Sequence, residues 1–244
     1  MGKERLDSLL VARGMLDSLD DSKRVIRAGK VRVDGMVADK PGYLYPADAE
    51  IEVLRPPKYV SRGGEKLAAA FQNFALDVDG MVCLDVGAST GGFTDCLLQN
   101  GAVKVYAVDC GRGQLHWRLR RDERVVMMER TNARYMEPSD FDQLAQFAVV
   151  DASFISLAKL LPAIVRVTAP ASRIVALIKP QFEARRSQVE DGGVVRDPDV
   201  HREVMDNIRA FGEKNLDLLW IDSCESPIKG PAGNIEFLSY WEKR

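Results

Sequence analysis

The hydrophobic residues of the chain after residue 66 fall into short runs, separated by stretches of helical character. Each run is rich in valine and isoleucine and apolar almost throughout, which is typical of strands covered on both faces of a parallel sheet. The alternation of such strands with helices predicts an α/β architecture. The five predicted strands are residues 81–87 (MVCLDVG), 103–109 (VKVYAVD), 124–129 (RVVMME), 147–153 (FAVVDAS) and 173–180 (RIVALIKP).

The end of the chain departs from this alternation. Two further apolar segments, residues 217–223 (DLLWIDS) and 234–242 (NIEFLSYWE), are joined by the loop SPIKGPAG, which leaves no room for a helix. A short connection of this kind predicts an antiparallel hairpin. We therefore expect a Rossmann-like sheet that is mostly parallel and ends in an antiparallel C-terminal hairpin strand.

The first 55 residues carry a different pattern. Leucines in the first dozen residues repeat with a helical period, and residues 20–30 (DDSKRVIRAGK) predict a second short helix that ends at Gly29. A turn at Asp34 and Gly35 predicts a hairpin, and IEVL predicts another short strand. This helix-turn-helix pair followed by strands indicates a small α+β domain.

A change in composition separates the two parts. Residues 55–66 (RPPKYVSRGGEK) contain two prolines and two glycines, which are typical of a linker or an interdomain turn. We predict a small N-terminal domain over residues 1–55, a linker over residues 56–64 and a larger domain over residues 65–244. The two adjacent prolines would stiffen the connection.

The composition is that of a globular protein that buries a core, with 46% hydrophobic and 29% charged residues among 244. None of the four cysteines forms a CxxC pair, and both histidines are far from every cysteine, so we expect no metal site. Reduced cysteines in apolar surroundings favour a cytoplasmic protein. No signal-peptide pattern and no run of roughly 18 apolar residues is present in the sequence, so we expect no membrane partner.

The segment CLDVGASTGGFTD, residues 83–95, predicts a ligand-binding turn. A buried strand reaches Asp85, and a loop from Gly87 to Gly92 leads into a helix. Glycines let the backbone approach a ligand closely, beside the N-terminus of the following helix. The next strand ends at Asp109, where an acid binds ribose hydroxyls in dinucleotide folds. The alternative is a tight turn with an aspartate at the surface.

The loop also narrows the choice of cofactor. It is not GxxxxGK[ST], which excludes a P-loop, and it is not GxGxxG, because Ser89 occupies the third position. The Asp85 carboxylate would repel a pyrophosphate but would attract the sulfonium and amino groups of S-adenosylmethionine. This favours methyl transfer over hydride transfer. The candidate cofactor residues are Asp85, Gly87, Ser89, Thr90, Gly91, Gly92, Phe93, Asp109, Asn132 and Asp151.

Five motifs, taken in order, resemble a known family over essentially the whole chain. They are YVSRGGEKL, LDVGASTGGFTD, VVDASFISL, IKPQFEARRSQVEDGGVVRDPDVH and SPIKGPAGNIEF. The chain resembles the TlyA family, hemolysin-like proteins understood as 2′-O-methyltransferases of ribosomal RNA, and its larger domain is similar to FtsJ-type methyltransferases. The segment KRVIRAGKVRVDG resembles a small RNA-binding domain shared by pseudouridine synthases and a small-subunit ribosomal protein. The resemblance implies S-adenosylmethionine as cofactor, and cytidine in ribosomal RNA or ribosomal subunits as the substrate.

The resemblance also implies a Lys-Asp-Lys-Glu catalytic tetrad. Matched motif to motif, its members are Lys66 in SRGGEKL, Asp151 in VVDASF, Lys179 in LIKPQFE and Glu236 in GNIEF. Asp151 and Lys179 end predicted parallel strands, and ligands of open α/β sheets bind beyond those ends. The alternatives are an ordinary helix start at Lys66, a surface lysine at position 179 and a solvent-facing strand residue at position 236.

A ribose hydroxyl is a poor nucleophile and must lose its proton during methyl transfer. A desolvated lysine beside another cation can act as the general base, and we assign this role to Lys179. Lys66 would assist it and hold the RNA backbone, while Asp151 would orient Lys179 near the transferring methyl group. Glu236 would position a lysine or the ribose. The reaction needs no metal, because the leaving group departs neutral.

The net charge of −2 argues weakly against nucleic-acid binding unless positive charge is concentrated locally. Residues 22–33 supply such a concentration, with five basic residues and no acid. Lys23, Arg24 and Arg27 have helical spacing and share one face, for which the alternative is an ordinary solvated surface. We expect phosphate contacts with little recognition of bases. The candidate RNA-binding residues are Lys23, Arg24, Arg27, Lys30, Arg32 and Arg62, with Arg185 and Arg186 as extensions.

Two other functions are compatible with the sequence. One is an RNA-binding protein that keeps the fold without catalysis, which a methyl-transfer assay would distinguish. The other is a membrane-active hemolysin, in line with the family's historical name, although no apolar span or strongly amphipathic basic helix supports it. The intact tetrad and glycine loop favour the methyltransferase.

Overall fold

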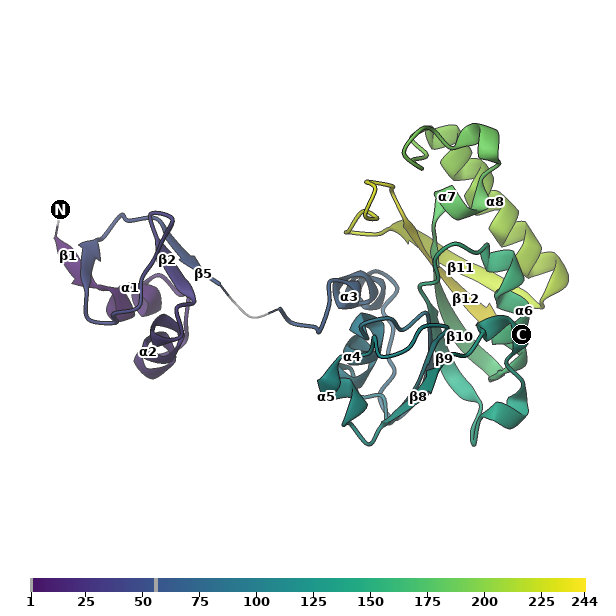
Figure 1. Ribbon diagram of the computed structural model, residues 1–244, viewed down its shortest axis with the longest axis horizontal. Helices are drawn as coiled ribbons and strands as arrows, with labels where there is room; N and C mark the ends of the chain where they lie inside the picture. Colours follow the sequence, from purple (N-terminus) through teal and green to yellow (C-terminus); the bar gives the residue numbers. More distant parts are fainter. Residues whose placement is uncertain (1, 55–56) are drawn as a thin grey trace. The chain divides into compact units, whose positions relative to one another are not determined.

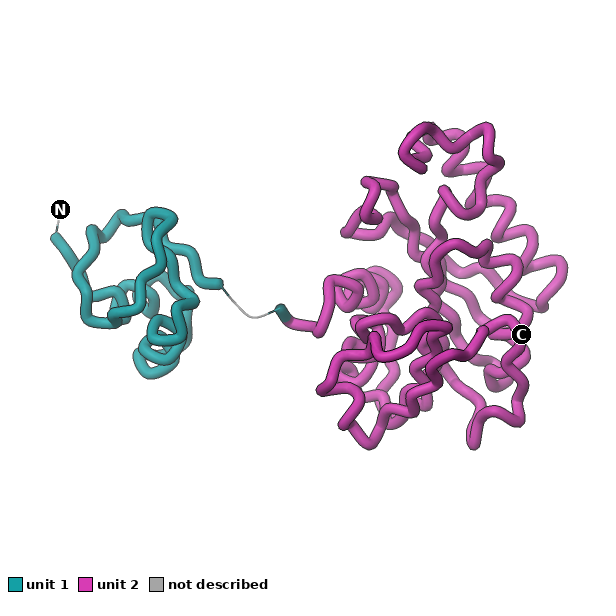
Figure 2. Tube along the Cα trace, viewed as in Figure 1, with its two compact units in different colours: residues 1–57 teal, residues 58–244 magenta. Residues whose placement is uncertain are grey.

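The computed structural model describes residues 2–54 and 57–244. The chain divides into two compact units, residues 1–57 and 58–244 (Figure 2). Arg55 and Pro56, at the predicted domain boundary, lie outside the described residues, and so does the predicted stiffening by the proline pair. Residues 58–64, which the sequence analysis assigns to a linker, belong to the second unit, where Tyr59 is buried and packs against Gly64.

The first unit combines two short helices with short strands (Figure 1). Its elements are β1 (Lys3–Arg5), α1 (Leu6–Ala12), α2 (Leu19–Arg27), β2 (Val31–Val33), β3 (Met36–Val37), β4 (Leu44–Pro46) and β5 (Ile51–Val53). β2 pairs antiparallel with both β3 and β5, and β1 pairs with β4. The core is built from Leu6, Leu10 and Ile26 of the helices and from Val31 and Val33 of β2, all of them buried.

Local signals in the sequence account for α2 and for the hairpin. Ser18 caps α2 by accepting a hydrogen bond from the backbone N–H of Asp21, and the helix ends shortly before Gly29, which has a φ of +66°. β2 and β3 meet at Asp34 and Gly35, both with positive φ, as a two-residue hairpin turn of type I′ requires. The predicted helix and hairpin are confirmed, whereas β1 and β4 were not predicted.

The second unit is built on a seven-stranded sheet with helices on both faces (Figure 1). Its strands are β6 (Val82–Val86), β7 (Lys104–Asp109), β8 (Val125–Glu129), β9 (Ala145–Val150), β10 (Thr168–Ile178), β11 (Leu218–Glu225) and β12 (Phe237–Lys243). Its α-helices are α3 (Gly63–Asn73), α4 (Gly92–Gln99), α5 (Trp117–Arg120), α6 (Leu161–Arg166), α7 (Pro180–Glu183) and α8 (Pro198–Asn215). Short 3₁₀ turns cover Ala133–Tyr135, Pro138–Asp140, Leu157–Lys159 and Arg186–Gln188.

The strand order confirms the fold predicted from the sequence. The sheet runs β11-β12-β10-β9-β6-β7-β8, and the five strands from β6 to β10 are mutually parallel. β12 lies antiparallel between β10 and β11, so that it forms the expected C-terminal hairpin with β11. The loops that follow β6, β7, β9 and β10 therefore meet at one edge of the sheet.

Two hydrophobic layers cover the sheet. On one face, α6 and α8 contribute Leu161, Ile164 and Val204 to a cluster that includes Leu84 of β6. On the other face, α3, α4 and α5 form a second cluster that includes Cys83 of β6. Because successive residues of a strand point to opposite faces, β6 supplies both clusters alternately, and Asp85 points toward the α4 side.

Candidate active site

The glycine loop brings the end of β6 against the end of β9. Gly87 has a φ of +86°, and a Cβ atom placed on it would lie 2.5 Å from the carbonyl oxygen of Asp151. Only glycine combines this backbone conformation with so close an approach. The loop is held further by hydrogen bonds from the N–H groups of Gly87 and Ala88 to the carbonyl oxygen of Val108. A rigid backbone turn thus joins three parallel strands at the edge of the sheet.

A cavity of about 460 Å³ opens beside this loop, and we call it the Asp109 cavity. The Asp109 carboxylate is fixed by two backbone N–H groups, from Ser89 at 2.8 Å and from Gly111 at 2.7 Å. None of the residues that line the cavity is basic. They are Val86, Gly87, Ser89, Val108, Asp109, Cys110, Gln114, Thr131, Asn132, Ala133, Asp151, Ala152, Ser153, Phe154, Ile155 and Leu160.

A second cavity, of about 340 Å³, lies on the other side of the loop, and we call it the Lys66 cavity. Gly87, Ser89 and Asp151 line both cavities, so the two adjoin. The second lining includes three cations and one acid. It consists of Ser61, Arg62, Gly63, Lys66, Gly87, Ala88, Ser89, Thr90, Gly92, Phe93, Asp151, Ile228, Lys229 and Pro231.

Most of the predicted cofactor residues line one or both of the two cavities. Gly87, Ser89, Asp109, Asn132 and Asp151 line the Asp109 cavity. The next part of the loop and the start of α4 instead line the Lys66 cavity, through Thr90, Gly92 and Phe93. Asp85 and Gly91 line neither of the two cavities.

Asp85 differs most from the expectation of direct contact with a cationic ligand. Its side chain is fully buried on the α4 side of the sheet and accepts a hydrogen bond from the Thr94 hydroxyl at 2.6 Å. Burial raises the pKa of the Asp85 carboxyl to about 7. The strand pleat explains the difference, because a residue one position before the strand tip points to a covered face. Asp85 thus braces the base of the loop through α4.

Gly91 and Gly92 serve packing in the structure. Gly91 has a φ of +98°, and a Cβ atom there would lie 2.2 Å from Leu119 of α5. A Cβ atom on Gly92 would lie 2.7 Å from the backbone nitrogen of Gly64, at the start of α3. These glycines let α3 and α5 approach the start of α4, which closes the wall of the Lys66 cavity.

The four predicted tetrad residues form one continuous line of ion pairs. Lys179 Nζ lies 2.6 Å from Asp151 Oδ1, and Lys66 Nζ lies 3.7 Å from Asp151 Oδ2 and 2.6 Å from Glu236 Oε2. Glu236 precedes β12 and is buried, so the structure contradicts the solvent-facing alternative for this residue. The Lys179 side chain is 9% exposed, which contradicts the alternative of a surface lysine. Lys66 does lie in the first turn of α3, as its alternative states, but its side chain is only 12% exposed and takes part in these ion pairs.

The two lysines have different surroundings. Lys66 forms ion pairs with two carboxylates, those of Asp151 and Glu236. Lys179 forms an ion pair with one carboxylate, that of Asp151, and donates a hydrogen bond to the neutral Ser153 hydroxyl at 2.9 Å. Lys66 lines its cavity, whereas Lys179 lines neither cavity and sits behind two wall residues of the Asp109 cavity, Asp151 and Ser153.

The loop after β9 supplies a feature that the sequence analysis missed. Phe154 lines the Asp109 cavity, is 90% exposed and has a φ of +62°, a strained conformation for an aromatic residue. The buried Glu183 carboxylate holds this loop by accepting hydrogen bonds from the Ser156 hydroxyl at 2.6 Å and the Leu157 N–H at 2.7 Å. Burial raises the pKa of Glu183. The sequence gives no sign that an apolar residue such as Phe154 is exposed.

Lys229 was also missed. It belongs to the loop SPIKGPAG and lines the Lys66 cavity, as does Arg62, which was predicted. The buried Asn234 anchors this loop by accepting from the Val195 N–H at 2.9 Å and donating to the Gly193 carbonyl oxygen at 2.8 Å. A single lysine in a glycine- and proline-rich loop gives no pattern from which to predict a site.

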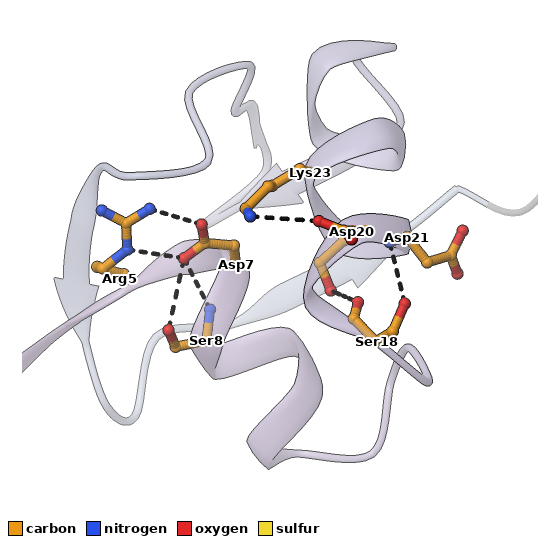
Figure 3. Close-up of polar contacts among 8 residues, drawn as sticks. Arg5, Asp7, Ser8, Ser18, Asp20, Asp21 and Lys23 are labelled. Atoms are coloured by element: carbon orange, nitrogen blue, oxygen red, sulfur yellow. Dashed lines mark hydrogen bonds and ion pairs between the residues drawn. The ribbon is translucent and has the colours of Figure 1, made fainter.

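The basic face of the first unit is partly neutralised. Lys23 forms an ion pair with Asp20 at 3.3 Å, across one helical turn (Figure 3). Arg24 forms one with Asp21 at the same spacing. Arg32 lies 4.0 Å from Glu52. Asp20 and Asp21 stand just before residues 22–33, the segment that was counted as free of acid, so the excess of positive charge is smaller than predicted. Of the candidate residues in this unit, Arg27 and Lys30 are exposed without an ion pair among the described residues.

The two arginines proposed as extensions of the RNA track lie apart from both cavities. Arg185 forms an ion pair with Glu203 of α8 at 2.5 Å, and neither it nor Arg186 lines a cavity wall described above. Across residues 2–54 and 57–244, no group of three or more His, Cys, Asp or Glu side chains could hold a metal ion. In the same part of the chain, no helix has the length and apolar character needed to cross a membrane.

Comparison with known proteins agrees with this architecture. A model of FtsJ-like methyltransferases matches residues 59–243, and a model of the S4 domain matches residues 4–51. The 16S/23S rRNA (cytidine-2′-O)-methyltransferase TlyA of Mycobacterium tuberculosis is 44% identical over 96% of this chain and 88% of its own length. YqxC of Bacillus subtilis, named provisionally as an rRNA methyltransferase, is 48% identical over 97% of this chain and 84% of its own length.

A solved structure also matches the whole chain. It comes from Streptococcus thermophilus, and its name uses the word hemolysin. It is 45% identical, covers 100% of this chain and 89% of its own, and has a TM-score of 0.76. Fold and cavities together define a Rossmann-like methyltransferase with an appended S4 domain. The chain belongs to the TlyA family of FtsJ-like methyltransferases, which confirms the resemblance noted from its motifs.

Proposed function

We propose that this protein transfers the methyl group of S-adenosylmethionine to the ribose 2′-hydroxyl of a cytidine in ribosomal RNA. One observation carries the proposal: Asp151 lines both cavities and is ion-paired with Lys66 and Lys179. A methyl donor in one cavity and a ribose in the other would therefore meet at a group that also contacts a general base. The named activity of TlyA from Mycobacterium tuberculosis supports the choice of substrate.

The Asp109 cavity suits S-adenosylmethionine in size and in charge. Its volume of about 460 Å³ is typical of small-molecule sites. Asp109 is held by two N–H groups and presents a fixed carboxylate to ribose hydroxyls, while the Asn132 side chain can bind a polar edge of the adenine. Asp151 would lie near the sulfonium and the amino group, and the absence of basic side chains from the wall suits these two cationic groups.

The Lys66 cavity suits a polyanion. Arg62, Lys66 and Lys229 line it, and cationic side chains at a cleft attract and position phosphates. Arg62 and Lys229 are exposed and have no ion pair within the described part of the chain. They are free to contact the RNA backbone on either side of the target nucleotide.

We assign the roles of the two lysines from their positions and contacts. Lys66 lines its cavity and is ion-paired with Glu236 and Asp151, so it would contact the ribose and the RNA backbone. Lys179 contacts the Asp151 carboxylate and the Ser153 hydroxyl, and we assign it the role of general base. Its amine would take the proton of the 2′-hydroxyl as the oxygen attacks the methyl carbon. S-Adenosylmethionine supplies a sulfonium-bound methyl group, whose sulfur leaves as a neutral thioether.

The proposal is tested by product analysis. The purified protein is incubated with S-adenosylmethionine carrying a labelled methyl group and with ribosomal RNA from cells that lack the protein. The RNA is then digested to nucleosides and separated, and we expect the label in 2′-O-methylcytidine. Label in a base-methylated nucleoside, or no label in RNA while S-adenosylmethionine still binds, would contradict the proposal.

A further inference from the structure

The segment that follows Asp109 in the chain carries positive charge that the sites described above do not use. Residues 112–134 contain seven arginines and three acidic residues, in a chain of net charge −2. Arg120 is ion-paired with Glu129, and Arg124 with Asp122. The other five arginines are exposed and have no ion pair within the described residues: Arg112, Arg118, Arg121, Arg130 and Arg134. We call this group, together with Trp117, the α5 edge.

An exposed indole lies at the centre of the α5 edge. Trp117 begins α5 and is 58% exposed. The guanidinium carbons of Arg121 and Arg118 lie over its ring, 5.4 and 5.8 Å from the centre, which places two charges at the indole. An aromatic ring flanked by arginines is the combination on which proteins stack unpaired nucleobases while binding the neighbouring phosphates.

The α5 edge is continuous with the Lys66 cavity. The backbone N–H of His116 donates a hydrogen bond to the carbonyl oxygen of Thr90 at 3.0 Å, and Thr90 lines that cavity. The ring of His116 lies 5.7 Å from that of Trp117. A strand of RNA whose ribose enters the Lys66 cavity would therefore pass over the α5 edge as it leaves.

We propose that the α5 edge is a second RNA-contact surface of the methyltransferase unit, on which an unpaired nucleobase stacks against Trp117 while Arg118 and Arg121 bind the flanking phosphates. This inference rests on the proposed function for its choice of RNA as the occupant. Stacking needs an exposed base face, so the surface selects unpaired nucleotides over duplex.

The test measures RNA binding by the full-length protein through fluorescence anisotropy. The probes are labelled single-stranded (rU)12 and the duplex (rA)12·(rU)12. Trp117→Ala should weaken binding of the single strand by about 5- to 150-fold, the range that base stacking contributes, and Trp117→Phe should restore most of it. Binding of the duplex should change much less. Arg118→Ala combined with Arg121→Ala should flatten the salt dependence on the single strand by roughly 1.4 in log–log slope.

Arg209→Ala is the matched control, because Arg209 is an exposed helical arginine on α8. This helix packs beside β11, the edge strand at the opposite side of the sheet from β8. This variant should change neither binding nor its salt slope. Affinity for S-adenosylmethionine and the melting temperature should be unchanged in all variants, which excludes loss of folding as the cause.

Single-stranded RNA bound with wild-type affinity by both α5-edge variants would overturn the inference, even where the wild-type protein methylates ribosomal RNA. Weakened binding to intact ribosomal subunits alone, with the oligonucleotides unaffected, would also overturn it and assign the surface to a ribosomal protein. Weakened binding of the single strand without any methyl transfer by the wild type would uphold the inference and overturn the proposed function.

Discussion

The Asp109 cavity and the Lys66 cavity share three wall residues and yet differ in charge. The lining of the Asp109 cavity contains two aspartates and no basic residue, whereas Arg62, Lys66 and Lys229 line the Lys66 cavity beside the shared Asp151. Opposite fields on the two sides of one glycine loop can separate a cationic donor from an anionic acceptor before reaction. Under the proposed function, this difference in charge would direct the cationic donor and the polyanionic acceptor to separate cavities that meet at Asp151.

The largest effect should come from the lysine behind the shared wall. Lys179→Ala should lower methyl transfer by about 100-fold or more, because a general base acts in the transition state, while both ligands still bind. Lys179→Arg should not restore activity, since arginine keeps its proton in proteins. Single-turnover kinetics with ribosomal RNA would measure both variants.

Lys66→Arg is the matched comparison, because a permanent cation should substitute there better than at position 179. An active Lys179→Arg variant would exclude Lys179 as the base. A Lys179→Ala variant whose sole defect is weak RNA binding would make this lysine an electrostatic clamp instead.

Gly87→Val should abolish much of the binding of S-adenosylmethionine. The added side chain would start 2.5 Å from the Asp151 carbonyl oxygen and force the loop away from β9, at a φ that suits glycine. Thermal shift against ligand concentration would measure the loss.

Gly35→Val is a useful control for Gly87→Val, because it changes a positive-φ glycine of the first unit that has no neighbour near its Cβ position. A normal shift with S-adenosylmethionine in the Gly87→Val protein would show that the loop does not border the cofactor.

A smaller effect is expected from the basic face of the first unit. Arg27→Ala should flatten the salt dependence of RNA binding by roughly 0.7 in log–log slope. Lys23→Ala and Arg24→Ala should each do less, because these residues already contact Asp20 and Asp21. Anisotropy with ribosomal RNA at several salt concentrations would rank the three variants. An unchanged salt slope in the variant that combines all three substitutions would show that this face does not contact the RNA.

The smallest effect should be on stability, through Asp85 behind the loop. The pKa of the Asp85 carboxyl is about 7 in the folded protein, above its ordinary value of 3.8. The protonated carboxyl therefore contributes stability that is complete below about pH 4 and is lost as the pH rises from there through 7. Asp85→Asn removes this loss. The melting temperature of the variant relative to wild type should therefore rise by several degrees between pH 5 and pH 8. A difference in melting temperature between variant and wild type that stays constant with pH would contradict the presence of a buried titrating carboxyl at position 85.

The fold could be predicted because its strands carry a strong local pattern. Valine- and isoleucine-rich runs mark β6 to β10, and a loop too short for a helix marks the hairpin of β11 and β12. Three predicted site residues, Asp109, Asp151 and Lys179, lie at or directly after strand ends, and topology alone gathers such positions at one edge.

What could not be predicted depends on side-chain direction and on loops. Asp85 is one residue from the strand tip and points away from the cavity because of the pleat. Phe154 and Lys229 lie in loops whose path is set by contacts distant in sequence, including those of Glu183 and Asn234. The acids that neutralise Lys23 and Arg24 were visible in the sequence, one helical turn earlier.

The separation of the two ligands by charge is tested most directly by reversing the charge of one cavity alone. Arg62 and Lys229 line the Lys66 cavity, are exposed and lie outside the Asp109 cavity, so their replacement should leave the folded protein intact. Calorimetric titration of Arg62→Glu combined with Lys229→Glu should give an affinity for S-adenosylmethionine within about two-fold of wild type, and an affinity for ribosomal RNA weaker by at least about 10-fold. Loss of S-adenosylmethionine binding in this variant would contradict the account, because it would place the carboxylate of the cofactor among the cations assigned here to RNA.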